Sequence, residues 1–199
     1  MKPVLLHACC APCASAVYES LADDFDVTVF YYNPNIDPEP EYRARLGELE
    51  RFAALRDFPL FTGGYDAAEW TRRVEPYQSL GERSERCREC FRVRLDGSFR
   101  KAKELGIDAV TTTLTVSPHK DADMINGVGK ELESRHGIEF IEGDFKKSGG
   151  YRRSIELSRR YDFYRQNYCG CVYSRRERER HSGRSRSKPA YQSIHTISS

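Results

Sequence analysis

The sequence PVLLHACCAPC, at residues 3–13, decides the fold because it leads from a buried strand straight into a helix. Its short apolar run is typical of a strand covered on both faces, and Pro12 is a residue favoured in the first turn of a helix. Cys9, Cys10 and Cys13 fall at the junction of the two elements. Ligands of parallel sheets bind just beyond the carboxyl ends of the strands, so we expect these thiols to belong to a site.

The alternation of strand and helix continues along the chain. Short apolar or β-branched runs predict four more strands, at residues 27–32, 59–62, 109–116 and 138–141. Apolar residues at helical spacing predict helices at residues 12–22, 41–56, 87–105, 121–136 and 149–164. We therefore expect an α/β fold of the HUP-like, nucleotide-hydrolase kind, with a doubly wound, mostly parallel five-stranded sheet and helices on both faces.

The chain has 199 residues, about the length of one domain. We expect a single α/β domain over residues 1–173, with a basic helical segment near its C-terminal end, and a basic tail over residues 174–199. The tail lacks apolar periodicity, so we expect it to be disordered when free. No uncharged stretch reaches the roughly 18 residues of a membrane helix, so we expect no membrane partner.

The net charge of +2 hides an uneven distribution of charge. Residues 152–188 carry 12 basic and 4 acidic side chains, whereas the first 151 residues carry 20 basic and 26 acidic ones. This split indicates either a nucleic-acid-binding end or a solvated tail. Tyrosines alternate with arginines between residues 159 and 175, a mixture that suits base stacking together with phosphate contacts.

Seven cysteines form three tight clusters along the chain: Cys9, Cys10 and Cys13; Cys87 and Cys90; Cys169 and Cys171. An odd, clustered set favours metal or redox chemistry in a reducing compartment, so we expect a cytoplasmic protein without a disulfide framework. Two separated Cys-x-x-Cys pairs fit an iron–sulfur cluster, a Cys₄ zinc site or unliganded buried thiols, and the spacing does not separate these alternatives.

The third cluster, Cys169-Gly170-Cys171, suggests a different chemistry. Gly170 permits a sharp turn that would bring the two sulfurs together. A disulfide across so small a ring is strained and easily reduced, which is typical of a catalytic bond rather than a stabilising one. The alternative is that the two thiols are further metal ligands.

Other polar residues are less informative about function. No Walker A sequence or GxGxxG follows a predicted strand, and Ser148-Gly149-Gly150 is interpreted as a turn into a helix, so we expect no use of ATP. His119 follows the fourth predicted strand and is either a proton donor or a solvent-facing group. His7, within the first strand, is interpreted as a hydrogen-bonded interior histidine.

Taken together, five motifs resemble the cobalamin-independent epoxyqueuosine reductase family, QueH. They are HACCAPC at residues 7–13, CRECFRVRL at 87–95, SPHKD at 117–121, GYRRS at 150–154 and YRQNYCGC at 164–171. The resemblance covers about residues 1–175. It implies an oxidoreductase that removes the epoxide oxygen of epoxyqueuosine at the tRNA wobble position with two electrons, in the last step of queuosine biosynthesis.

The resemblance also implies the cofactors and the partners. It places a [4Fe–4S] cluster on Cys9, Cys10, Cys87 and Cys90, and a redox-active disulfide between Cys169 and Cys171. It associates an additional mononuclear iron with Cys13, and it implies no cobalamin. The partner is the anticodon stem-loop of a tRNA carrying epoxyqueuosine, for which Arg152, Arg153 and Arg165 are candidate contacts. The external electron donor is not identified by the sequence.

Two other functions are compatible with parts of this pattern. An iron–sulfur tRNA sulfurtransferase has a similar sheet and similar cysteines, but it requires an early phosphate-binding loop that this sequence lacks. A non-enzymatic, zinc-bound RNA-binding module explains the basic end and both Cys-x-x-Cys pairs, but gives no reason for Cys169-Gly170-Cys171.

Overall fold

The centre of the fold is a parallel sheet whose strand order reverses at its middle. The computed structural model describes residues 1–147 and 149–186. The strands are β1 (Lys2–Ala8), β2 (Phe25–Tyr31), β3 (Leu60–Thr62), β4 (Ala109–Thr112) and β5 (Glu139–Phe140). They pair in the order β3-β2-β1-β4-β5, all parallel. The carboxyl ends of β1 and β4 therefore form the switch point at which such folds bind ligands.

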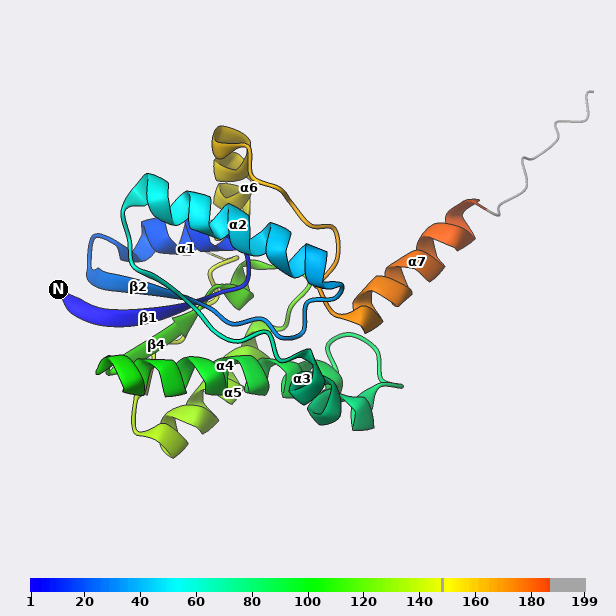
Figure 1. The fold of residues 1–199 in the computed structure, drawn as a ribbon, viewed down its shortest axis with the longest axis horizontal. Helices are drawn as coiled ribbons and strands as arrows, with labels where there is room; N and C mark the ends of the chain where they lie inside the picture. Colours follow the sequence, from blue (N-terminus) through cyan, green and yellow to red (C-terminus); the bar gives the residue numbers. More distant parts are fainter. Residues whose placement is uncertain (148, 187–199) are drawn as a thin grey trace, which may run out of the picture.

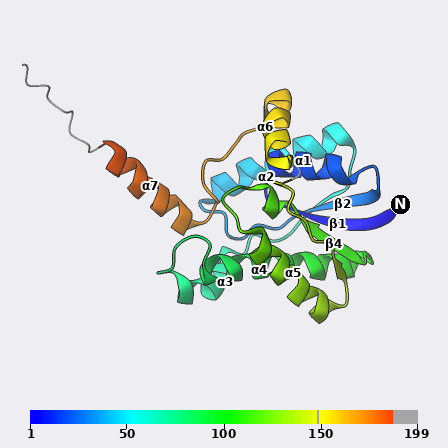
Figure 2. The same cartoon turned by 180° about the vertical axis from the view of Figure 1, so that it is seen from behind.

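Helices cover both faces of the sheet, as Figures 1 and 2 show. One side carries α1 (Ala11–Leu21), α2 (Glu39–Arg56) and α6 (Gly150–Tyr161). The other carries α3 (Ala67–Val74), α4 (Glu85–Leu105) and α5 (Ala122–His136). The predicted α/β class, the five parallel strands and the helices on both faces are confirmed.

The side chains of β1 alternate between the two halves of the core. Val4 and Leu6 pack with residues of α1 and α2, whereas Leu5 packs with residues of α4 and α5. All three are fully buried. A strand buried on both faces reads as a continuous apolar run, which is why residues 4–6 marked the centre of the sheet.

Two predicted strands are shorter in the structure. The β-branched run at 109–116 forms β4 only to Thr112 and continues as a 3-10 turn over Thr113–Val116. The Oγ1 of Thr112 accepts a hydrogen bond from the backbone N–H of Leu114, which turns the chain away from the sheet. The last strand, predicted at 138–141, is β5 with two residues.

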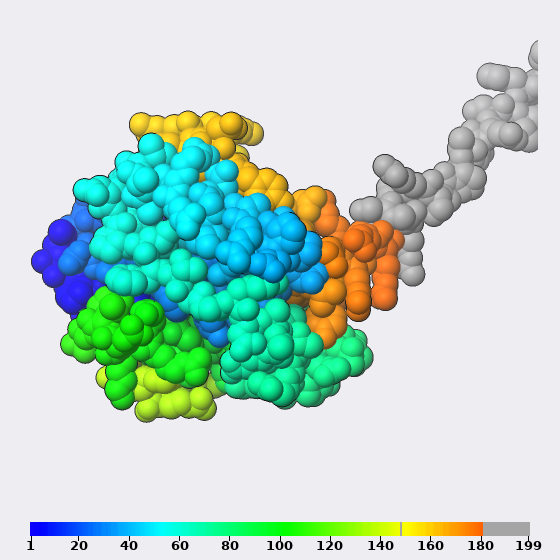
Figure 3. Space-filling model, viewed as in Figure 1, coloured from blue at the N-terminus to red at the C-terminus, as the bar shows by residue number. Residues whose placement is uncertain are grey.

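The C-terminal region differs from the expected disorder beyond residue 173. Helix α7 spans Val172–Arg186 and points away from the body of the molecule (Figure 1). Its first turns lie against the body (Figure 3), where Glu177 pairs with Arg86 of α4 at 2.8 Å and Arg175 pairs with Asp37 at 2.8 Å. The prediction of disorder rested on the lack of apolar periodicity, and a helix held by ion pairs leaves no such pattern in the sequence. The rest of the predicted tail, residues 187–199, lies outside the described residues.

The structure also bears on the predicted turn at residues 148–150 and on the expectation of no membrane helix. Gly149, with a φ of 76°, precedes the first residue of α6, while Ser148 of the same predicted turn lies outside the described residues. Among residues 1–147 and 149–186, no helix has both the length and the apolar character that a membrane span requires.

Gly129 lets α5 approach β5 closely. A Cβ atom at Gly129 would overlap the ring of Phe140, which is buried against Phe99. Gly127 lies in the same helix, and a Cβ atom there would meet only open space. Gly129→Ala should therefore destabilise the protein by about 1–3 kcal/mol through overpacking. Gly127→Ala should stabilise it by roughly 0.5–1 kcal/mol because alanine is the better helix former.

Urea unfolding of both variants measures these two changes against the wild type. Equal shifts in the free energy of unfolding would contradict the close packing of α5 on β5.

Candidate functional site

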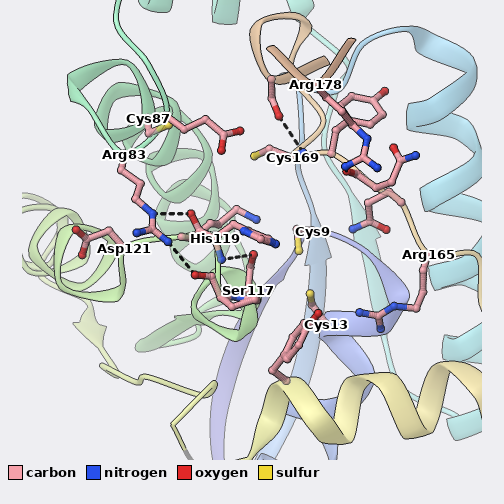
Figure 4. A pocket seen from close by; sticks show the side chains of 18 of the residues that line it. Cys9, Cys13, Arg83, Cys87, Ser117, His119, Asp121, Arg165, Cys169 and Arg178 are labelled. Carbon is pink, nitrogen blue, oxygen red and sulfur yellow. Dashed lines mark hydrogen bonds between the residues drawn. The ribbon is translucent and has the colours of Figure 1, made fainter. Parts of the chain in front are cut away.

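A cavity of about 770 Å³ opens at the carboxyl edge of the sheet. Cys9 and Cys13 line it from the β1–α1 turn, Cys87 from the first turn of α4, and Cys169 from the segment before α7 (Figure 4). All three cysteine clusters of the sequence thus meet at one site, where the sheet topology predicts ligand binding.

The tightest group of thiols lies in the β1–α1 turn. The Sγ atoms of Cys9, Cys10 and Cys13 all lie within 4.8 Å of one another, and those of Cys9 and Cys10 are 3.7 Å apart. Cys10 is the extended residue before α1, and Cys13 falls in the first turn of that helix, so both sulfurs face the helix N-terminus. Thr113 fixes Cys9 by accepting from its N–H at 3.1 Å and donating to its Sγ at 3.4 Å.

The pKa values of these three thiols are shifted in opposite directions. Hydrogen bonds from Cys10 and Cys13 lower the pKa of Cys9 well below that of an ordinary thiol. The pKa of Cys13 is raised well above it by the hydrogen bonds to Cys10 and Cys9. For Cys10, the hydrogen bond from Cys13 is outweighed by the one to Cys9 and by burial, and its pKa rises to about 11. Cys9 is therefore the thiol of this cluster that ionises most easily, and the thiolate is the form that binds a metal.

Two cations, Arg94 buried and Lys120 half-buried, lie near this sulfur cluster. Arg94 of α4 is 2% exposed and donates from Nη2 to Oδ1 of Asn33 at 2.5 Å. Lys120 lines the cavity. Burial lowers the pKa of Lys120, but the nearby sulfurs of Cys169, Cys9 and Cys13 outweigh it and raise the pKa to about 12. The site thus combines several sulfurs with fixed positive charge, an arrangement that stabilises thiolates.

Cys87 and Cys90 lie outside the 4.8 Å group, which contains only three thiols among the residues described. Cys87 is half-buried on the cavity wall, and Cys90 is buried beneath it on the same face of α4. Burial raises the pKa of both, to about 11 for Cys87. Trp70 and Arg94 lie beside Cys90 and partly offset that effect.

Buried donors near Cys90 remain without partners. In the described part of the chain, Nε1 of Trp70 and Nε of Arg94 are buried and have no partner at normal hydrogen-bond distance, although both side chains lie near enough to the Cys90 sulfur to lower its pKa. Leaving buried donors unpaired costs free energy, and both would be satisfied by an anionic sulfur group. Four or more thiols around one cavity, with unused donors behind them, fit a thiolate-bound metal group such as an iron–sulfur cluster.

Cys169-Gly170-Cys171 forms a tight turn whose two thiols are not bonded to each other in the structure. Gly170 has a φ of 126°, and a Cβ atom there would lie 3.0 Å from Nη1 of Arg45. Cys169 lines the cavity, whereas Cys171 is 9% exposed and burial raises its pKa. The disulfide between them stays a prediction.

The candidate arginines separate into two groups. Arg165 lines the cavity and donates to the carbonyl of Ser154 at 3.0 Å. Arg152 and Arg153 are exposed on α6 outside the cavity wall and pair with Glu156. Only Arg165 is therefore brought to the cysteines.

His119 lies on the cavity wall, exposed to solvent (Figure 4). Its backbone N–H donates to Oγ of Ser117, and Arg83 donates to its carbonyl at 3.1 Å. The structure thus places the side chain at the site without giving it a hydrogen-bond partner among the described residues.

Four residues at the site were not singled out from the sequence: Arg45, Arg94, Lys120 and Gln166. Gln166 donates from Nε2 to Sγ of Cys10 at 3.1 Å. Arg94 and Lys120 stand inside quoted motifs, and Arg94 follows Cys90 by one helical turn, which was a usable signal. Gln166 stands in the quoted motif at 164–171, but its contact with Cys10 arises only through the tertiary fold, as does that of Arg45 with Cys169.

Comparisons with known proteins give the family. The family model described as Epoxyqueuosine reductase QueH matches residues 4–177, a range that includes all seven cysteines. The chain belongs to the QueH family.

Two relatives carry the description Epoxyqueuosine reductase QueH. The protein from Streptococcus pyogenes serotype M1 is 41% identical over 179 residues, covering 86% of this chain and 69% of that protein. The protein from Thermotoga maritima is 37% identical over 192 residues, covering 94% of this chain and 98% of that protein. The QueH match thus extends over the whole α/β body and the start of α7.

A solved structure shows the same fold. The crystal structure of a predicted subunit of tRNA methyltransferase from Methanocaldococcus jannaschii superposes with a TM-score of 0.54 over 96% of this chain and 94% of that one. The two sequences are 14% identical, so this likeness concerns the fold alone.

His7 lies under the cysteine turn as the predicted interior histidine. Its Nδ1 accepts from Oγ1 of Thr112 at 2.9 Å, and its Nε2 donates to the carbonyl of Tyr32 at 3.2 Å. Burial, helped by the charge of Arg94, lowers the pKa of His7 to about 3. In the unfolded chain, the imidazole of His7 takes up a proton below about pH 6.5, whereas in the folded protein it stays neutral until the pH approaches 3.

The free energy of unfolding should therefore decrease as the pH is lowered from about 6.5 to 3. His7 should contribute up to roughly 1.4 kcal/mol of this decrease per pH unit. His7→Gln should be less stable than the wild type near neutral pH, and the difference should narrow as the pH falls. Urea unfolding of both proteins at several pH values measures the two slopes. Parallel slopes would show that His7 is not held neutral.

Proposed function

We propose that this chain is an epoxyqueuosine reductase that acts on epoxyqueuosine at the wobble position of tRNA in the last step of queuosine biosynthesis. The reaction consumes two electrons and two protons, releases the epoxide oxygen as water and leaves the cyclopentene ring of queuosine. The observation that carries the proposal is the convergence of three cysteine clusters on one cavity in a member of the QueH family. Reduced thiols of this kind persist in the cytoplasm, where we place the protein.

The ligands proposed for a [4Fe–4S] cluster are Cys9, Cys10, Cys87 and Cys90. Their support is the cavity that Cys9 and Cys87 line, the lowered pKa of Cys9 and the buried donors beside Cys90. When bound, such a cluster supplies electrons one at a time. Cys13 faces the same cavity and is the proposed ligand of an additional mononuclear iron. The proposal requires neither cobalamin nor ATP.

The chain's own residues supply the surroundings of the reaction. Lys120 holds a proton at the cavity wall beside the sulfurs, and Arg94 offsets the negative charge that a thiolate centre accumulates. Cys169 and Cys171 are the proposed redox pair. Forming one disulfide bond releases the two electrons and two protons that one turnover consumes, and an external electron donor must then restore the thiols.

The entrance to the cavity suits an RNA loop. Arg83, Arg165 and Arg178 line it together with Tyr151 and Tyr168. This mixture offers phosphate contacts and aromatic faces for an unstacked base. Helix α7 extends away from the body (Figure 2) and carries several arginines, and α6 carries Arg152 and Arg153. We propose that these elements hold the anticodon stem-loop.

Replacing both Cys169 and Cys171 by serine should abolish multiple turnover and leave the metal centre in place, because the pair stores electrons without binding the cluster. Anaerobic absorbance spectra, with iron, sulfide and zinc counted on the same sample, measure the centre. About four sulfides and at least four irons per chain are expected for the wild type and the variant alike. Lost absorbance in the variant would make the two cysteines ligands. Colourless wild-type protein with one zinc would remove the reductase proposal and favour a zinc-bound RNA-binding module.

Binding of epoxyqueuosine tRNA should weaken steeply with salt because phosphate contacts release counterions. Arg176 and Arg180 are exposed on α7, and replacing both by glutamine should reduce the slope of log K against log salt by about two. Lys103→Gln, at the end of α4 away from the cavity, is the control and should leave the slope unchanged. Equal slopes in all three proteins would exclude α7 from the tRNA interface.

A further inference from the structure

The Cys169-Gly170-Cys171 turn is attached to the body of the protein by one buried arginine. Arg45 of α2 is 2% exposed. It donates from Nη1 to the carbonyl of Cys169 at 3.1 Å and from Nη2 to the carbonyl of Tyr168 at 3.4 Å. Its side chain also lies over the ring of Tyr168, with Cζ 5.3 Å from the ring centroid. A single guanidinium thus holds two successive peptide units of the turn.

Arg45 is itself held in place from its own helix. Its Nε donates to Oε1 of Glu41 at 2.8 Å, and Oε2 of Glu41 accepts from the hydroxyl of Tyr164 at 3.0 Å. The planar guanidinium is therefore fixed on both sides, by a carboxylate on α2 and by carbonyls of the turn. Lysine, with a single ammonium, has no such set of fixed donor directions.

The backbone of the turn completes the attachment. The carbonyl of Gly170 accepts from the N–H of Asp37 at 2.8 Å, and the hydroxyl of Tyr168 donates to the carbonyl of Asp37 at 2.7 Å. A side chain at Gly170 would approach Arg45 and Ile36 at 3.0 and 3.1 Å. The turn is therefore docked on the loop between β2 and α2 with no room to shift.

This attachment separates the directions of the two thiols. Cys169 faces the cavity, as Figure 4 shows, whereas Cys171 is buried and its Sγ accepts from the N–H of Ser174 at 3.4 Å. The Oγ of Ser174 in turn accepts from the N–H of Cys169 at 3.1 Å. The two cysteines, two residues apart, are thus presented as one accessible and one shielded thiol.

We propose that Arg45 is a positioning residue that presents Cys169 to the cavity and keeps Cys171 shielded, without itself contacting the substrate. The expected effect of Arg45 on turnover rests on the proposed reductase function. Its expected effect on the reactivity of the two thiols does not, because that effect follows from the contacts of the turn alone.

The test measures which thiol reacts. The protein, with its metal centre as purified, is exposed anaerobically to limiting iodoacetamide and digested with trypsin. Cleavage after Arg165 and Arg175 gives the peptide QNYCGCVYSR, which contains Cys169, Cys171 and no other cysteine. Fragment ions in mass spectrometry then give the ratio of alkylation at the two sites. Cys169 should react preferentially in the wild type.

Arg45→Gln should lower this ratio by about tenfold, the scale of a lost hydrogen bond to a charged group. Arg45→Lys keeps the charge but not the paired donors, so its ratio should also fall. The matched control is Arg43→Gln, because Arg43 makes the same i,i+4 ion pair on α2, with Glu39 at 2.9 Å, and is exposed. Its ratio should equal that of the wild type.

An unchanged ratio in Arg45→Gln would overturn the proposal. If that variant does not fold, Glu41→Ala replaces it: it removes the acceptor that holds Nε of Arg45, and an unchanged ratio there would overturn the proposal equally.

Steady-state kinetics distinguish positioning from substrate contact. Arg45→Gln should lower kcat and leave KM for the tRNA unchanged, because a misplaced thiol slows the chemical step and leaves binding intact. A raised KM with unchanged kcat would make Arg45 a substrate contact and overturn the proposal. A wild-type protein without reductase activity would overturn the proposed function, and the alkylation ratio would still decide the role of Arg45.

Discussion

The carboxyl end of β1 is the constraint on which the rest of the structure depends. β1 pairs with both β2 and β4 and is buried on both faces, so the chain leaves it at a fixed point and in a fixed direction. Cys9 and Cys10 follow at once, and α1 begins at Ala11. Parallel strands all deliver their carboxyl ends to the same edge, so the turns after β2 and β4 reach the same place. Asn33 from one turn consequently donates to the carbonyl of Ala8, just before the cysteines, and Lys120 from the other lines the cavity.

Buried charge gives the site its second property. Arg45 and Arg94 are buried near thiols, and burying a cation is costly unless an anion or a set of acceptors balances it. Arg45 has a carboxylate and two carbonyls. Arg94 has one amide oxygen and an Nε without a partner. The interior around Cys90 is therefore undersupplied with negative charge, and a thiolate centre is the group that would restore the balance.

The sequence predicted what depends on local pattern. The five strands and their parallel arrangement followed from apolar runs alternating with helical periodicity. The placement of Cys9 after a strand put the first cysteine cluster at the ligand-binding edge, whereas a site shared with Cys87 and Cys90 was implied only by the family resemblance. Arg45 was not found, because a charged residue on an amphipathic helix looks solvent-exposed until the segment at 168–170 covers it. The first turns of α7 were missed for a similar reason: Arg86 and Glu177 are 91 residues apart, and no local pattern joins them.

The same few residues connect the Cys169-Gly170-Cys171 turn to the basic end of the chain. Cys171 is the last residue before α7, and Ser174 in the first turn of that helix contacts both Cys169 and Cys171. In the same part of the helix, Glu177 pairs with Arg86 of α4, and Arg175 pairs with Asp37 in the loop before α2. That loop is also the one on which Gly170 is docked. The direction in which α7 leaves the body and the direction in which Cys169 faces the cavity are therefore set by one group of contacts.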